Sequence, residues 1–109
     1  MDFPYCKLEI FIPQTHLEPL RKALQAADAG HIGRYDMCLS YSPVTSCWRP
    51  LAGSVPWLGE TGVLSTEPEL KVEVTCRTAL VRRTVEAVKA VHPYEEPVIN
   101  VIPLAGVGL

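Results

Sequence analysis

The feature that most restricts the fold of this chain is the order in which two hydrophobic periods follow one another. Alternation of apolar and polar side chains predicts strands at 5–12, 34–42, 69–76 and 98–102. Apolar side chains at helical spacing predict one helix between Thr15 and Gly30 and another between Thr78 and His92. This order predicts an α+β, ferredoxin-like βαββαβ fold: an antiparallel four-stranded sheet with both helices on one face.

Local signals predict where the helices begin and end. Thr15 and Glu18 have the spacing of a capping box at the start of the first helix, and Gly30 suits the left-handed residue that ends it. Thr78 is expected to cap the second helix, and His92 ends it because it precedes a proline.

One core is expected between the sheet and the helices. It would contain Leu8, Ile10, Leu20, Leu24, Val72, Val74, Val85, Val88 and Ile99. Residues 43–68 break the pattern with four prolines and three glycines, so we expect a long excursion between the second and third strands. A short hairpin around 46–49 is one form that this excursion could take.

Composition narrows the function classes. The 109 residues fit one domain, 1–109, and a net charge of −2 without a basic stripe argues against nucleic acid. No apolar run reaches the length of a membrane span and no signal peptide is evident, so we expect a soluble, cytoplasmic protein. Four cysteines without C-x-x-C spacing are expected to be reduced, Cys6 and Cys76 inside the core. An apolar fraction of 48% favours self-association.

Two segments, 30–38 (GHIGRYDMC) and 92–97 (HPYEEP), resemble the inserted domain of the Nif-three-like family. That family is also known as NGG-one-interacting factor three, YqfO/YbgI or GTP cyclohydrolase type homologues. Residues 49–62 between them resemble its linking loop, although 44–48 (VTSCW) lacks the usual glycine-rich turn, so a differently shaped hairpin is expected. The resemblance implies a CutA/PII-like fold and a trimer. It places the ligands of the family's dinuclear metal site outside this domain, so we expect a stand-alone domain without that site.

The turn at 92–97 is the main candidate site, because prolines at both ends would hold an imidazole, a phenol and two carboxylates in place. The topology brings the excursion to the same end of the sheet. Candidate ligand-binding residues are therefore His92, Tyr94, Glu95, Glu96, Arg49 and Glu60. Arg49 is the expected partner of whichever glutamate faces the excursion, with the other facing away. A turn that merely stops the helix is the alternative.

Other candidates are weaker. His31 would lie at the opposite end of the sheet, and 30–33 follows a helix rather than opening one, so it is not a phosphate-binding loop. His92, Glu95 and Glu96 are weak candidates for a metal, and the spacing of Cys38 and Cys47 matches no standard metal site. The two tryptophans of the excursion, Trp48 and Trp57, are expected to pack at a subunit interface rather than to stack on a base.

The expected function is a non-catalytic, oligomeric ligand-binding or regulatory module, since no nucleophile stands with an evident base. A divalent metal-ion-binding protein of the CutA type is the alternative, with a divalent metal ion as the possible cofactor. A hydrolase, from the family label alone, is a second alternative. The partners expected are other copies of the chain and a small polar ligand or a protein.

Overall fold

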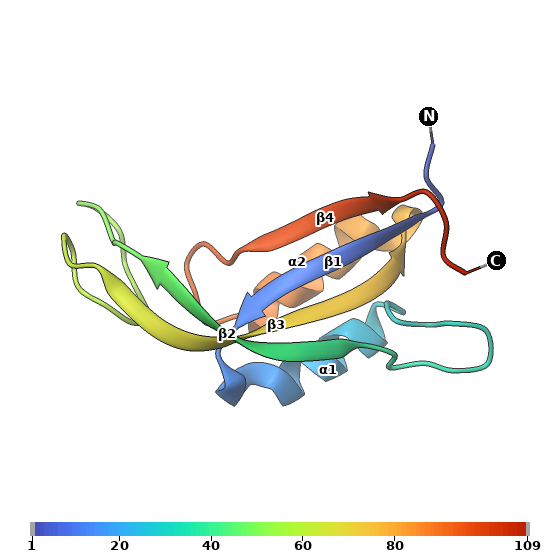
Figure 1. Ribbon diagram of the computed structural model, residues 1–109, viewed down its shortest axis with the longest axis horizontal. Helices are drawn as coiled ribbons and strands as arrows, with labels where there is room; N and C mark the ends of the chain where they lie inside the picture. Colours follow the sequence, from blue (N-terminus) through green and yellow to red (C-terminus); the bar gives the residue numbers. More distant parts are fainter. Residues whose placement is uncertain (1, 109) are drawn as a thin grey trace.

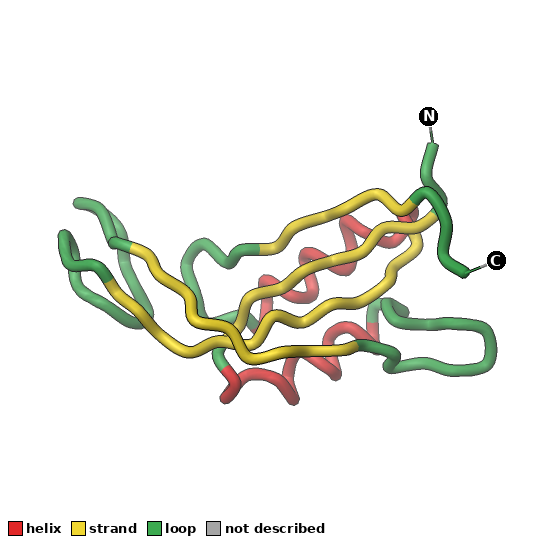
Figure 2. Tube along the Cα trace, in the orientation of Figure 1, coloured by secondary structure: helices red, strands yellow, loops and turns green. Residues whose placement is uncertain are grey.

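The computed structural model describes residues 2–108. Its strands are β1 (Tyr5–Ile12), β2 (Ser40–Trp48), β3 (Ser65–Arg77) and β4 (Ile99–Leu104), and its helices are α1 (Leu17–Ala26) and α2 (Val81–Val91). A short 3-10 turn precedes each helix, η1 (Gln14–His16) and η2 (Thr78–Leu80). Within the described residues the strands form one antiparallel sheet in the order β2-β3-β1-β4, and α1 and α2 cover the same face (Figures 1 and 2). The predicted ferredoxin-like fold is confirmed.

The core lies between the sheet and the helices, where we expected it. Seven of the nine predicted core residues are buried in one cluster: Leu8, Ile10, Leu20, Leu24, Val72, Val74 and Val88. Ile99 packs against that cluster while partly exposed, and Val85 is half-buried and outside it. Thr84 is buried instead, because its hydroxyl donates to the Leu80 carbonyl (2.7 Å) and so needs no water.

The second strand is not where the alternation predicted it. β2 begins at Ser40, and 34–39 belong to a loop. Met37 has a φ of 55°, which interrupts the extended backbone. The Cys38 N–H donates to the Gly30 carbonyl (3.0 Å) and closes the loop, which projects from one end of the molecule (Figure 1).

Much of the expected excursion is regular sheet. Residues 43–48 of β2 pair with 65–70 of β3, so the connecting loop is only 49–64 and the hairpin is far longer than the one considered around 46–49. Pro43 is tolerated because β2 is an edge strand. Pro68 is tolerated because β1 stops at Ile12, opposite Leu70, and leaves that part of β3 unpaired on one side. Figure 1 shows this hairpin extending beyond the rest of the sheet.

The predicted capping box does not form. α1 begins after a 3-10 turn, where the Thr15 hydroxyl bonds the His16 ring (2.8 Å) and Glu18 pairs with Arg21 (3.0 Å). Thr78 is no cap either, because its hydroxyl donates to a backbone carbonyl near the N-terminus, that of Phe3.

The end of α1 is set by Asp28 rather than by Gly30. Asp28 has a φ of 65°, its N–H donates to the Gln25 carbonyl (3.0 Å), and the Ala29 N–H donates to the Leu24 carbonyl (2.9 Å). These two bonds make a Schellman motif, which satisfies the last carbonyls of the helix. Gly30 lies two residues further on and does not end the helix; its backbone groups bond to Thr75 of β3 and to Cys38 of the loop.

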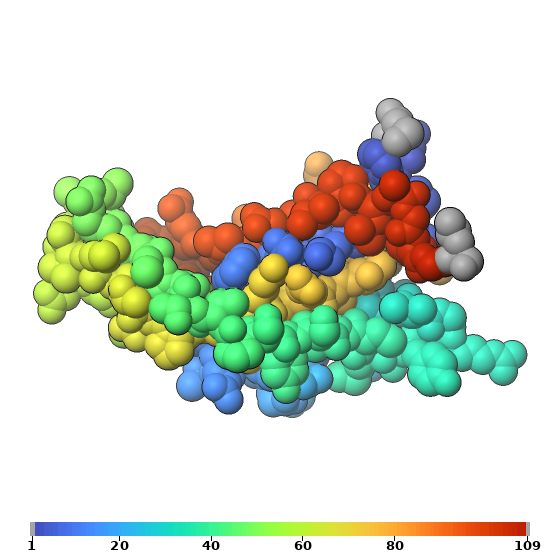
Figure 3. Space-filling model, in the orientation of Figure 1, coloured from blue at the N-terminus to red at the C-terminus, as the bar shows by residue number. Residues whose placement is uncertain are grey.

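Figure 3 looks onto the face of the sheet that the helices leave uncovered. Charged side chains lie at the centre of this face, on β1 and β3. Lys7, Glu9, Lys71 and Glu73 form a closed ring of ion pairs across β1 and β3, with N–O distances of 3.2 to 3.6 Å. The lysines thus separate two glutamates that lie directly opposite each other. The Lys71 ammonium, by hydrogen bonding to it, lowers the pKa of Glu9.

The four cysteines are free, and Cys6 and Cys76 lie in the core as expected. Neither helix described between residues 2 and 108 has the length and apolar character needed to cross a membrane.

Candidate functional site

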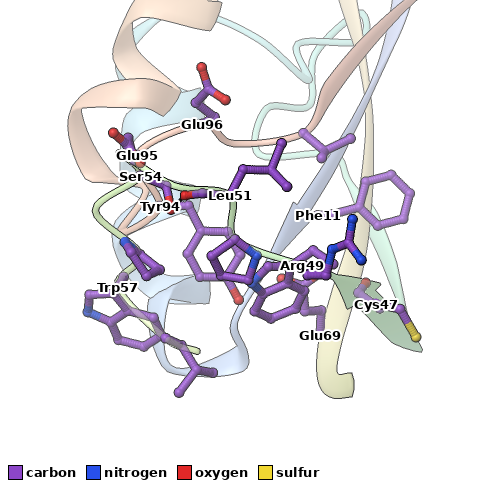
Figure 4. Close-up of a pocket in the computed structure, with 16 residues that line it drawn as sticks. Phe11, Cys47, Arg49, Leu51, Ser54, Trp57, Glu69, Tyr94, Glu95 and Glu96 are labelled. Atoms are coloured by element: carbon purple, nitrogen blue, oxygen red, sulfur yellow. Dashed lines mark hydrogen bonds between the residues drawn. The ribbon is translucent and has the colours of Figure 1, made fainter. Parts of the chain in front are cut away.

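A cavity of about 540 Å³ lies beyond the end of β1, between the projecting hairpin and the turn that leads into β4 (Figure 4). Its walls come from Phe11 of β1, the end of β2, the loop at 49–58, Glu69 of β3 and the turn at 94–98. The hairpin reaches past the sheet, and the turn returns from the helix layer over the same end. The pocket therefore depends on two segments about forty residues apart in sequence, which Val55 and Glu95 join by a hydrogen bond.

Tyr94 is the centre of an aromatic row in this pocket. Its ring centroid lies 5.5 Å from that of Trp48 and 5.8 Å from that of Trp57, both at tilted angles. His92 packs on Tyr94 at 5.0 Å. Such tilted contacts are favourable between aromatic rings, so the row ties loop, hairpin and turn together. Both tryptophans contact a ring of their own chain, and their packing at a subunit interface stays a prediction.

Glu69 is the pocket residue that the sequence did not reveal. The strand alternation placed it on the polar, exposed face with Lys71 and Glu73, yet it is only 5% exposed. Its Oε2 atom is buried and has no hydrogen-bond partner among residues 2–108. Burial raises the pKa of Tyr94 well above its ordinary value, and a hydrogen bond from its phenol to the Glu69 carboxylate adds to that rise.

His92 supports the turn from behind instead of lining the cavity. It is buried, its Nε2 donates to the Phe11 carbonyl (2.7 Å), and its Nδ1 accepts from the Tyr94 N–H (3.2 Å). Those two bonds require the neutral ring with its proton on Nε2. Burial lowers the pKa of His92 below its ordinary value of 6.5. His92 is not among the residues that line the cavity, and both of its ring nitrogens bond to backbone groups.

Acidification is therefore expected to destabilise the fold through His92. The unfolded chain takes up a proton near pH 6.5 while the folded ring resists it, so stability is full above that pH and falls as the pH drops through the lower folded value. Urea unfolding between about pH 7.5 and about pH 5.5 should show this loss, and His92→Gln should flatten it. The variant should also cost about 1–3 kcal/mol at neutral pH, because it disturbs two buried hydrogen bonds.

His31→Asn is the matched control for this titration. The hydrogen bond between His31 and Asp28 (2.8 Å) raises the pKa of His31. Protonation of His31 therefore adds to the stability of the folded chain as the pH falls. Removing it should make the acid loss steeper. Parallel pH profiles for the wild type and His92→Gln would contradict the role given to His92.

As expected, one of the two glutamates of the turn faces the excursion, but its partner is not Arg49. Glu95 faces the excursion, where its Oε2 accepts from the Val55 N–H (2.9 Å). Glu96 is exposed at the rim, and Figure 4 shows both away from Glu69. Among the described residues Arg49 forms no ion pair with either of them. A backbone donor already satisfies Glu95, so the predicted Arg49 pair is wrong, although Arg49 does line the pocket.

Two further candidates lie outside this pocket. Glu60 is exposed in the hairpin loop and is not among the residues that line the cavity. His31 lies in the loop at the opposite end of the molecule (Figure 1), as the topology predicted, and bonds Asp28 and the Gly33 carbonyl (3.0 Å).

Metal-binding groups are dispersed across the described part of the chain. No three His, Cys, Asp or Glu side chains of residues 2–108 gather closely enough to hold a metal ion. Both ring nitrogens of His92 are hydrogen bonded to backbone groups. The Cys38 thiol contacts the Asp36 carbonyl and the Cys47 thiol contacts the Thr66 hydroxyl, each at 3.6 Å.

The fold is that of a CutA-like α+β domain, and comparison with known proteins agrees. The Archaeoglobus fulgidus periplasmic divalent cation tolerance protein CutA superposes with a TM-score of 0.71 at 22% identity, over 96% of this chain and 87% of that one. At that identity the likeness shows the fold alone. A Bacillus cereus protein related to NIF3 gives a TM-score of 0.83 at 36% identity, over 95% of this chain and 26% of that one.

Sequence relatives carry the name GTP cyclohydrolase 1 type 2 homolog. Those of Halalkalibacterium halodurans and Bacillus subtilis are 40% and 34% identical, over 94% and 93% of this chain. The resemblance to the CutA-like domain of the Nif-three-like family is thereby confirmed. The chain spans only 27% of the length of these curated relatives. No family model matches it.

Proposed function

We propose that this chain is a non-catalytic, oligomeric ligand-binding or regulatory module of the Nif-three-like family, and that a small ligand enters the pocket between the hairpin and the 94–98 turn. One observation carries the proposal: a cavity of about 540 Å³ is lined by an aromatic row and by Glu69, whose buried Oε2 has no hydrogen-bond partner in the described part of the chain. The volume is typical of sites for small organic molecules. Convergent polar groups on apolar walls are the usual composition of such sites.

The chemistry of the lining supports binding rather than catalysis. The Ser54 hydroxyl donates to the Leu51 carbonyl (2.7 Å), and the Cys47 thiol lies beside a threonine, so neither has a base beside it in the described structure. The hydrolase activity in the relatives' name belongs to proteins of which this chain matches 27%. We therefore propose no reaction for this chain.

Self-association is part of the same proposal, with a trimer as the favoured form and the cytoplasm as the location. Both edge strands expose large apolar side chains, Tyr41 on β2 and Val101 and Ile102 on β4. Exposed apolar edges are usually covered in native proteins, and another copy of the chain would cover them.

Ligand-observed NMR with a set of small ring compounds of positive, negative and no charge tests the binding proposal. We expect several compounds to bind, and expect Ser46→Trp to weaken their binding strongly, because Ser46 lines the cavity and an indole there would obstruct it. Ser42→Trp is the matched control, since it lies on the same face of β2 outside the pocket. Native mass spectrometry of the same samples should give a mass three times that of one chain.

Binding that Ser46→Trp leaves undiminished, or the absence of any bound compound, would overturn the pocket as the binding site. A monomer mass at micromolar concentrations would overturn the assembly and leave the pocket to be judged by the NMR result.

A further inference from the structure

The partnerless oxygen of Glu69 restricts what can occupy the pocket. A carboxylate oxygen accepts hydrogen bonds and cannot donate them. Leaving such a group buried and unpaired is costly, and the cost is relieved when a ligand supplies a donor. The Tyr94 phenol hydrogen bonds the same carboxylate but has only one proton to donate, and Oε2 still has no partner among residues 2–108. Glu69 is 5% exposed and lines the cavity, so a further donor for Oε2 would come from within the pocket. A ligand that can only accept hydrogen bonds would leave Oε2 of Glu69 unpaired.

The charges around the cavity favour a cationic donor over a neutral one. Glu69, Glu95 and Glu96 line it, with Arg49 as the opposing charge. Arg49 is exposed and screened by water, whereas Glu69 is buried, where an ion pair is stronger. Glu95 already accepts from the Val55 N–H, so Glu69 holds the free buried acceptor.

The aromatic row favours an organic cation over a metal ion. Trp48, Tyr94 and Trp57 offer ring faces on which a flat apolar body can pack, and ring faces attract ammonium and guanidinium groups. A divalent ion needs several oxygen or nitrogen ligands at once, and residues 2–108 contain no cluster of three such side chains.

Taking these observations together, we propose that the pocket binds a ligand with an ammonium or guanidinium group on a flat, apolar body. One N–H of that cation donates to the Glu69 carboxylate, whose buried Oε2 turns toward the cavity on binding, and the body packs along Tyr94 and the tryptophans. This assignment rests on the pocket being a binding site, as proposed above, and names the class of ligand it accepts.

Three compounds with the same ring and different end groups test the assignment: 2-phenylethylamine, 2-phenylethanol and phenylacetate. Isothermal titration of the full chain should show the amine binding about tenfold or more tightly than the alcohol or the acid, the usual scale of a charge-assisted hydrogen bond. Glu69→Gln keeps the side-chain shape and removes the charge, and should abolish most of that preference. Glu67→Gln, two residues earlier on β3 and outside the lining, should change the amine affinity by less than about twofold.

The outcomes separate this assignment from the pocket proposal. Equal affinities for the three compounds, or tightest binding of phenylacetate, would overturn the cationic ligand while leaving the pocket as a site. The same holds if the amine fails to bind while other ring compounds bind in a manner sensitive to Ser46→Trp. If no compound of any charge binds, both proposals fall. Should Glu69→Gln not fold, the order of the three affinities in the wild type still decides.

Discussion

Gly30→Ala is expected to destabilise the fold by about 3–5 kcal/mol, combining backbone strain with lost hydrogen bonds. Gly30 has a φ of +76°, and a Cβ there would lie 2.5 Å from the Cys38 carbonyl oxygen. Because that oxygen is backbone, it cannot move away without the loop. The Gly30 N–H donates to the Thr75 carbonyl of β3 (2.8 Å), and its own carbonyl accepts from Cys38, so any shift weakens both bonds.

Gly33→Ala is the matched control, because Gly33 also has a positive φ (+58°) and lies in the same loop, but its Cβ would meet no atom within 4 Å. It should cost only the backbone strain, about 1 kcal/mol. Urea unfolding of both variants at one protein concentration measures the difference. Equal losses would show that the contact with Cys38 is not what requires a glycine at position 30.

Leu24→Ala is expected to cost about 2–5 kcal/mol, the range for deleting a buried leucine side chain. Leu24 is 2% exposed and belongs to the cluster between α1 and the sheet. The truncation leaves a cavity that the sheet cannot close, because β1 and β3 are fixed by pairing along their whole shared length. Alanine's high helix propensity offsets only a small part of this loss.

Leu64→Ala provides the comparison, since that leucine is 65% exposed in the hairpin loop and lines no pocket wall. Its loss should stay within about 0.5 kcal/mol. Both variants should be measured at the same protein concentration, because assembly would add to apparent stability. A loss below about 1 kcal/mol for Leu24→Ala would mean that α1 does not anchor the core as described.

The sequence by itself determined the order of elements and most of the core. Residues 5–12 and 70–76 alternate in a way that only a half-buried strand satisfies, and the alternation is set by neighbours two positions apart. The helices follow for the same local reason. Proline placed a turn at 92–97, and topology then placed the excursion beside it, which is where the pocket lies.

Only the tertiary structure decided where β2 begins, what His92 does and why Glu69 is buried. Loop 30–38 closes through bonds from Gly30 to Cys38 and to Thr75 of a distant strand, and no local pattern contains them. Glu69 is buried because β1 stops opposite Leu70 and the turn carrying Tyr94 covers the hairpin beyond that point. The length of a strand, its pairing and the segments that pack over it depend on residues far apart in sequence. A residue that the local alternation assigns to solvent can therefore be buried in a pocket.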